Sequence, residues 1–280
     1  MSEKHFKTFT ISRPDGFFDM LAQSARFEVF GPARSVAILL EPRETNLDHI
    51  GLPIVRTTTS YEMPPQFFEQ IHRDIAKDII ETSALPMQNI SFNNAMMERY
   101  TTAYRTMKFH TDHTLDLAQN SYIALYSCYN MSDDSNQLRK LVIRDKVSQE
   151  TSEITMHNNS VILFSTDSNQ QHQHKIVLVD PKKGVKKESE WIGITFRLSK
   201  TWLYKIDGKF CFENGKPIYF ASDEQIREFR RMKSEENELT DFSYPQIDFT
   251  ISRSDLLAPM RYSASNSLPS SNSIESADRK

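Results

Sequence analysis

Two histidine–aspartate pairs in the sequence have the residue types and the spacing that could bind a metal ion. His72 and Asp74 form one pair, and His110 and Asp112 form the other. Side chains two residues apart point to the same face of a β-strand, but they point away from each other on a helix. A pair on a strand can therefore bring an imidazole and a carboxylate to one ion, whereas a pair on a helix cannot readily do so.

The surrounding sequence separates the two pairs. Residues 64–83 are predicted to form an amphipathic helix, with Pro65 in its first turn and apolar residues at helical spacing at Phe68, Ile71, Ile75 and Ile79. His72 and Asp74 would then lie on a solvated helix face. The second pair lies in a strand-like region, so we expect this pair to bind the metal.

The third ligand must come from a neighbouring strand, and His172 and His174 are the candidates. His174 directly precedes the apolar run at residues 175–179, which is predicted to be a buried strand, and we favour it for that reason. Two histidines and one carboxylate occupy one face of an octahedron and leave three positions open, which suits non-haem Fe(II). The sequence therefore indicates a metal centre built from His110, Asp112 and His174.

Short strand-like runs separated by polar turns dominate residues 95–200. This pattern predicts an antiparallel sandwich or barrel rather than alternating strands and helices. The runs are residues 122–127, 141–144, 160–164, 175–179 and 191–197, and a similar run occurs earlier at residues 35–40. A charged hairpin turn is expected at residues 180–187.

The part of the chain after residue 200 has two clear local signals. A hairpin is expected around residues 213–216, because Asn-Gly is a typical turn sequence. Ser222 and Gln225 fit a capping box, which predicts a helix from there to about residue 235. Residues 262–280 are serine-rich with few large apolar side chains, so we expect a disordered tail.

The order and spacing of these residues resemble the AlkB-like branch of the iron(II)- and 2-oxoglutarate-dependent oxygenases. Residues 99–112 are similar to that branch's tyrosine, ten-residue step and His-x-Asp motif, here Tyr100, His110 and Asp112. Residues 173–176 are similar to its distal histidine followed by a small hydrophobic step, and residues 194–197 resemble the end of its arginine strand. The resemblance covers roughly residues 95–200.

This resemblance implies a fold, two cofactors and a reaction. The fold class would be α+β, with a double-stranded β-helix (jelly-roll) core and flanking helices. Fe(II), the co-substrate 2-oxoglutarate and O2 would hydroxylate an unactivated C–H bond, while 2-oxoglutarate is decarboxylated to succinate and carbon dioxide. Arg197 would bind a carboxylate of 2-oxoglutarate through its planar fork, and Tyr100 would donate its hydroxyl to the same co-substrate.

Two positions depart from the AlkB pattern. Glu98 stands where the pattern has asparagine, and a carboxylate facing the site would repel 2-oxoglutarate. Trp191 stands where the pattern has a first arginine that contributes to carboxylate binding. Three alternatives stay open: Arg197 and Tyr100 suffice, a lysine such as Lys175 helps, or the co-substrate binds in a different pose.

We expect four parts along the chain. Residues 1–94 would be an N-terminal extension whose helix packs on the core, and residues 95–205 would form the dioxygenase jelly roll. Residues 206–261 would add a C-terminal hairpin and helix, and residues 262–280 would be the tail. The sequence begins without the apolar core of a signal peptide and has no long apolar run, so we expect an intracellular protein, cytoplasmic or nuclear, with no membrane partner.

Composition limits the function classes. Glycine is scarce, at 7 of 280 residues, and no glycine-rich nucleotide-binding motif is present. Two cysteines are too few for a disulfide framework or a cysteine zinc site. The net charge of −3 does not indicate a nucleic-acid partner. We therefore favour a small-molecule or protein substrate of unknown identity; N-demethylation of nucleic-acid bases and a non-catalytic jelly-roll binding protein are the alternatives.

Overall fold

The computed structural model describes residues 5–44, 50–85, 90–131, 137–179 and 189–261. The expected turn at residues 180–187 and the expected tail at 262–280 lie outside them. The helices are α1 (Phe17–Ala22), α2 (Gln70–Thr82), α3 (Thr166–Gln171), α4 (Asp223–Glu238) and a 3-10 helix at Arg253–Leu256. The strands are β1 (Phe6–Thr10), β2 (Glu28–Val29), β3 (Arg34–Leu40), β4 (Arg43–Glu44), β5 (Ile50–Pro53), β6 (Gln66–Phe67), β7 (Asn94–Tyr100), β8 (Tyr122–Tyr129), β9 (Arg139–Asp145), β10 (Thr151–Met156), β11 (Ser160–Ser165), β12 (His172–Leu178), β13 (Trp191–Arg197), β14 (Trp202–Ile206), β15 (Lys209–Phe212), β16 (Tyr219–Phe220) and β17 (Phe249–Thr250).

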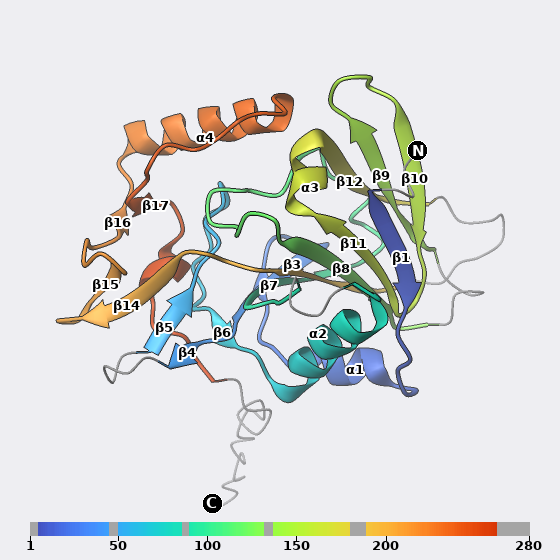
Figure 1. Ribbon diagram of the computed structural model, residues 1–280. Coiled ribbons are helices and arrows are strands. Elements are labelled where there is room, and N and C mark those ends of the chain that lie inside the picture. Colours follow the sequence, from blue (N-terminus) through green and yellow to red (C-terminus); the bar gives the residue numbers. More distant parts are fainter. Residues whose placement is uncertain (1–4, 45–49, 86–89, 132–136, 180–188, 262–280) are drawn as a thin grey trace, which may run out of the picture.

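Mostly antiparallel sheets with few helices make up the fold, in a jelly-roll-like arrangement (Figure 1). The larger sheet has the order β1-β11-β8-β13-β7-β3-β2, and β6 pairs in parallel with β3. The smaller sheet has the order β10-β9-β12. The two sheets face each other, because the side chains between them form one apolar cluster that includes Leu125, Phe164 and Trp191 from the larger sheet and Leu141 and Ile176 from the smaller.

The strands of the larger sheet alternate between its two faces, as an extended backbone requires. On β13, Ile192, Ile194 and Phe196 pack against α1 and α2, which cover the outer face of the sheet (Figure 1). Arg197 and Trp191 therefore point to the opposite face, between the sheets. The alternation of side chains along β13 thus places positions 191 and 197, where the AlkB pattern has its two arginines, in the interior of the sandwich.

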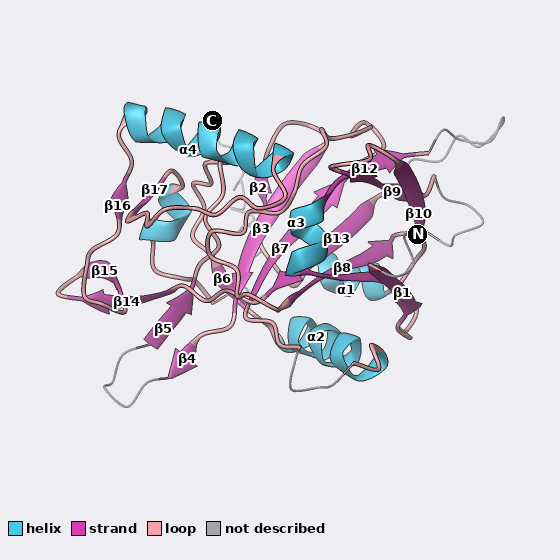
Figure 2. Cartoon of the chain, turned by 45° about the horizontal axis from the view of Figure 1, so that its top comes forward, coloured by secondary structure: helices cyan, strands magenta, loops and turns pink. Residues whose placement is uncertain are grey.

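The C-terminal part forms a second region around α4, which lies along one side of the molecule (Figure 2). Ser222 and Gln225 form the expected capping box, and α4 begins at Asp223. A turn at residues 213–216 is also present as expected, with Phe212 N donating to Lys216 O at 2.8 Å. No helix in the described parts of the chain is long and apolar enough to cross a membrane.

The helix expected at residues 64–83 begins later than predicted, at Gln70. Residues 66–67 form β6 instead and pair with Leu39 and Leu40 of β3, so Pro65 is not in a helical turn. The prediction that His72 lies on a solvated face is also wrong, because its side chain is completely buried. Contacts with segments distant in the sequence decide where α2 begins and that His72 is buried. A helical pattern in the sequence carries no information about such contacts.

The N-terminal segment contributes strands to the larger sheet. β1 pairs with β11 over five residues, and β3 pairs with β7 over seven. The division expected at residue 94 therefore runs through a sheet, between strands that pair with each other. The four expected parts of the chain stay a prediction.

Candidate metal centre

His110 and His174 are brought together by the backbone. Residues 106–110 run antiparallel to β12, with His110 N donating to His174 O at 3.0 Å and His174 N donating to His110 O at 2.7 Å. The strand expected around His110 and Asp112 is thus a single bridge at His110, and Asp112 follows in a loop. The two histidines lie side by side because their segments pair at this position.

The side chains of His110, Asp112 and His174 converge on one point. Each offers one ligand atom, and these atoms all lie within 4.8 Å of one another. His174 Nε2 lies 3.7 Å from Asp112 Oδ1, and the two imidazole centroids are 4.6 Å apart. His110 Nδ1 lies 3.1 Å from Lys108 O, which leaves Nε2 free, as is usual for a metal-binding histidine.

Asp112 is held in position from both sides. Arg197 Nε donates to Asp112 Oδ2 at 2.8 Å, and both side chains are almost fully buried. Asn169 of α3 makes two hydrogen bonds with the Asp112 backbone, accepting from its N at 2.8 Å and donating to its O at 3.1 Å. These contacts fix the carboxylate so that Oδ1 faces His174.

The electrostatics of the site favour the protonation states that bind a metal. Burial lowers the pKa of His110, and burial together with His110 lowers the pKa of His174 to about 3, so both imidazoles are neutral near pH 7. Burial would raise the pKa of Asp112, but the charge of Arg197 and its hydrogen bond to the carboxylate outweigh this effect and hold the pKa well below its usual range. Two neutral imidazoles and one carboxylate are the donor set of a facial Fe(II) site.

The cavity beside the three residues is small and lies between the two sheets. Its volume is about 40 Å³, which is room for a few water molecules. Its walls also include Arg197, Glu98 and Thr195 of the larger sheet and Leu141 and Ile176 of the smaller. The Glu98 carboxylate does face this cavity, but it is paired with Arg34, whose Nη2 lies 2.7 Å from Oε1.

The predicted co-substrate residues lie in different places. Arg197 lines the cavity while it also holds Asp112. Tyr100 lies further along β7 from Glu98, fully buried between the rings of Tyr104 and Trp191. The alternative that Lys175 contributes is wrong, because its ammonium lies 4.5 Å from the centroid of the Phe109 ring, on the face of β12 opposite to His174.

Two neighbouring histidines, His113 and His172, do not join the cluster. His113 Nε2 accepts a hydrogen bond from Thr58 N at 3.3 Å, and its Nδ1 lies 3.4 Å from the Tyr244 hydroxyl. His172 contacts Ser168 O at 2.9 Å and Asp145 at 3.6 Å, which supports the choice of His174.

A buried polar network links α4 to the loop that carries the cluster. Lys233 Nζ donates to Thr111 O at 2.6 Å and to Glu236 Oε2 at 2.8 Å. Glu236 Oε1 accepts from Thr114 N at 2.8 Å, and Asn237 Oδ1 accepts from Thr111 N at 3.0 Å. Sequence reasoning missed this network. The available signal was that Lys233 and Glu236 lie at helical spacing from Phe229, on the apolar side of α4.

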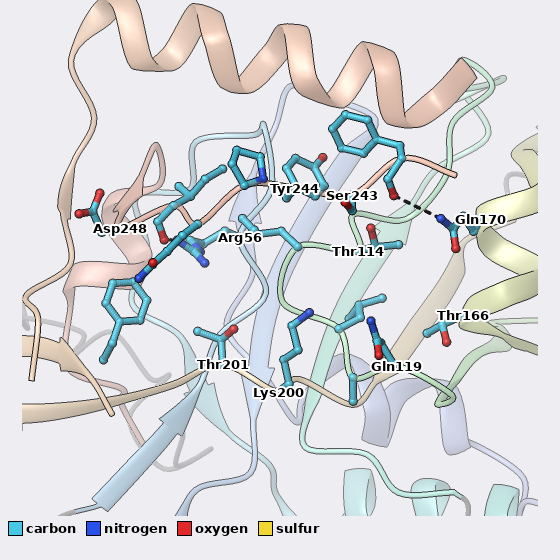
Figure 3. A pocket seen from close by; sticks show the side chains of 18 of the residues that line it. Arg56, Thr114, Gln119, Thr166, Gln170, Lys200, Thr201, Ser243, Tyr244 and Asp248 are labelled. Carbon is cyan, nitrogen blue, oxygen red and sulfur yellow. Dashed lines mark hydrogen bonds between the residues drawn. The ribbon is translucent and has the colours of Figure 1, made fainter. Parts of the chain in front are cut away.

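A larger cavity lies behind the same loop, below α4 (Figure 3). Its volume is about 490 Å³, and its walls include Thr114, Gln119, Lys200 and Tyr244, with Lys200 pointing into it. None of the three clustered residues lines it. The small cavity between the sheets is therefore the one that belongs to the histidine–aspartate cluster.

The fold and the site together define a jelly-roll-like β-sandwich with a buried His-Asp-His cluster. No family model matches this chain, and no curated protein matches it in sequence. Among solved structures it is similar to one described as "The structure of OsALKBH1", with a TM-score of 0.42 and 14% identity over 66% of this chain and 92% of that one. A likeness of this size does not establish a shared function.

Proposed function

We propose that this protein is an Fe(II)- and 2-oxoglutarate-dependent dioxygenase that hydroxylates an unactivated C–H bond. One observation carries the proposal: two imidazoles and one carboxylate, from His110, Asp112 and His174, lie within 4.8 Å of one another at a cavity inside a β-sandwich. The donor set fits Fe(II), and the opposite side of the ion would stay open for a co-substrate and O2. In this proposal the sandwich is a double-stranded β-helix, as the sequence resemblance implies.

In this proposal each residue of the site has a distinct role. His110, Asp112 and His174 would hold the ion, and Fe(II) would supply the activation of O2 and of a bound 2-oxo acid. Arg197 keeps the Asp112 carboxylate oriented through Nε, and its guanidinium makes no other hydrogen bond with a described residue, so its terminal nitrogens can bind a carboxylate. The apolar walls at Leu141 and Ile176 would keep bulk water from the reacting atoms.

For the primary substrate we propose a small molecule or a protein side chain. The net charge of −3 provides no global attraction for a nucleic acid. Base demethylation would need binding to single-stranded oligonucleotides that weakens with added salt. If such oligonucleotide binding is found, N-demethylation of nucleic-acid bases becomes the better proposal, and the proposed metal ligands stay the same.

Anaerobic titration with Fe(II), followed by 2-oxoglutarate, tests the proposal. We expect a weak visible charge-transfer band, and succinate once oxygen is admitted. His110→Ala and Asp112→Ala should each abolish Fe(II) binding, because three ligands are the minimum of this site. His157→Ala is the control, since His157 is exposed in the turn before β11.

The result that would overturn the proposal is equally specific. If the wild-type protein binds Fe(II) no more tightly than His110→Ala does, the cluster is not a metal centre. If Fe(II) binds but 2-oxoglutarate gives neither the band nor succinate, the protein is not a 2-oxoglutarate oxygenase, and a non-catalytic binding protein becomes the better interpretation.

A further inference from the structure

Unpaired polar atoms gather inside the sandwich, near the end of β13 opposite to Arg197 and outside the lining of the small cavity. In the described part of the chain, seven buried side-chain nitrogen or oxygen atoms have no hydrogen-bond partner. Four of them are Tyr100 Oη, Ser127 Oγ, Trp191 Nε1 and Arg139 Nε. Buried polar groups are usually paired, so four unpaired groups in one region call for an explanation such as a ligand.

The sheet register places these groups next to one another. Trp191 of β13 lies opposite Tyr100 of β7, and their rings are 4.9 Å apart. Ser127 of β8 lies opposite Gly193, two residues further along β13. Arg139 of β9 faces them from the smaller sheet, with its guanidinium carbon 5.0 Å from the centroid of the Tyr100 ring and 5.6 Å from that of Trp191.

Arg139 is a buried cation without an anion. Its side chain is 1% exposed, and no carboxylate pairs with it among the residues that the structure describes. Nη1 and Nη2 donate to the backbone carbonyls of Tyr104 and Thr101, at 2.8 and 2.9 Å, and Nε donates to nothing. Burial lowers the Arg139 pKa to about 10, which still leaves the group charged near pH 7. Burying a charge without an opposite charge beside it is costly, and a bound anion would remove that cost.

The same strands connect this cluster to the metal centre. Leu141, two residues after Arg139 on the same face of β9, lines the cavity beside the metal centre, and so does Glu98, two residues before Tyr100 on β7. The Trp191 indole lies over Gly193, where a Cβ would come within 2.0 Å of the ring. Gly193 therefore lets the indole lie against the sheet rather than project across the space between the sheets.

We propose that Arg139, with Tyr100, Ser127 and Trp191, forms a carboxylate-binding subsite that replaces the arginine absent at position 191. It would bind the distal carboxylate of a short dicarboxylate whose 2-oxo acid end binds the metal. Arg139 Nε, Trp191 Nε1 and the two hydroxyls supply donors for it. This inference rests on the proposed function and adds which residues select a dicarboxylate.

The test compares two ligands that differ in the second carboxylate. Isothermal titration of the Mn(II)-loaded protein with 2-oxoglutarate and with 2-oxobutyrate measures the preference for the dicarboxylate. We expect the wild type to prefer 2-oxoglutarate at least about tenfold, because a charge-assisted hydrogen bond contributes that much. Arg139→Gln should bind the two ligands about equally, with Mn(II) affinity unchanged within about twofold, since Arg139 contacts none of the metal ligands.

Two further variants separate binding from folding. Arg144→Gln is the matched control, because Arg144 lies on the outer face of the same strand, over the Phe109 ring, and its loss should leave the preference intact. Tyr100→Phe removes a single hydroxyl and keeps the packed ring, so it should reduce the preference with little change in the melting temperature. A structural role for Tyr100 would not affect one ligand more than the other.

The outcomes distinguish this inference from the proposed function. If Mn(II) does not bind to the wild type, both fail together. If Mn(II) and 2-oxobutyrate bind but the second carboxylate adds no affinity, the subsite is wrong while the metal centre stands. A preference that survives in Arg139→Gln and in Tyr100→Phe would likewise overturn the subsite alone.

Discussion

The His72 imidazole lies at the N-terminus of α2, where its side chain is completely buried. Nδ1 accepts a hydrogen bond from Glu69 N at 2.9 Å, and Nε2 lies 2.8 Å from Ser24 Oγ. Because the Glu69 N–H must donate, Nδ1 cannot carry a proton while this bond exists. Burial lowers the pKa of His72 from 6.5 to about 4, so the folded protein keeps this ring neutral.

His72 therefore predicts a loss of stability in mild acid. The folded pKa lies below the unfolded one, so the contribution is fully present above pH 6.5 and is lost as the pH falls toward 4. Between pH 7.5 and 5 the wild type should lose about 2 kcal/mol more of its free energy of unfolding than His72→Gln. Urea denaturation at both pH values measures the difference. Equal losses in the two proteins would mean that His72 is not buried as a neutral ring.

The C-terminal half of helix α4 contacts the loop that carries Asp112 of the His-Asp-His cluster. Lys233, Glu236 and Asn237 all bond to Thr111 or Thr114, which flank Asp112 in the loop. Lys233 and Glu236 form an almost fully buried ion pair, and such a pair is expensive to break because the remaining charge has no partner. The helix therefore holds the loop in place, although it contributes no metal ligand.

Replacing Lys233 tests this role of α4. Lys233→Met should lower the free energy of unfolding by about 3–5 kcal/mol, because Glu236 is left buried and unpaired. It should also weaken Mn(II) binding, because Thr111 lies between two ligands. Arg231→Met is the control, because Arg231 pairs with Glu228 and Glu235 on the exposed face, where solvent screens such pairs and their loss changes stability little. Unchanged Mn(II) affinity in a destabilised Lys233→Met would limit α4 to a role in folding.

Across the whole molecule, the His-Asp-His cluster depends on strands that lie far apart in the sequence. β1, at the N-terminus, closes one edge of the larger sheet by pairing with β11. Phe6 of β1 is buried between the sheets, with its ring centroid 5.0 Å from that of Phe164, and Phe164 in turn contacts His174. The first strand thus completes the packing behind His174 of the cluster.

Phe6→Ala tests whether the N-terminal strand belongs to the core. Truncating a buried phenylalanine usually costs about 3–5 kcal/mol, and we expect a loss of that size in the free energy of unfolding. Val29→Ala, on the exposed side of β2, should change it by less than about 0.5 kcal/mol. Chemical denaturation of both variants measures these values. A small effect of Phe6→Ala would mean that residues 6–10 only rest on the surface.

Local patterns in the sequence indicated β3, β8, β9, β11, β12 and β13, the α4 cap and the three residues of the His-Asp-His cluster. Alternating apolar residues mark β13 at Trp191–Arg197, and Ser222 and Gln225 mark the start of α4, because each pattern depends on a few neighbouring residues. The His-x-Asp pair and the histidine before an apolar strand were also found from the sequence, although the strand expected at Asp112 is a loop and only His110 forms a bridge, with His174.

Only the tertiary structure decided which polar groups are buried and what they contact. His72 contacts Ser24, Arg139 faces Tyr100 across the sandwich, and Lys233 reaches the loop of Asp112 from more than a hundred residues away. The cost of burying a charge or an imidazole depends on the partners that folding supplies. The sequence determined which groups could bind a metal, and long-range packing determined which of them are held together, neutral and shielded from water.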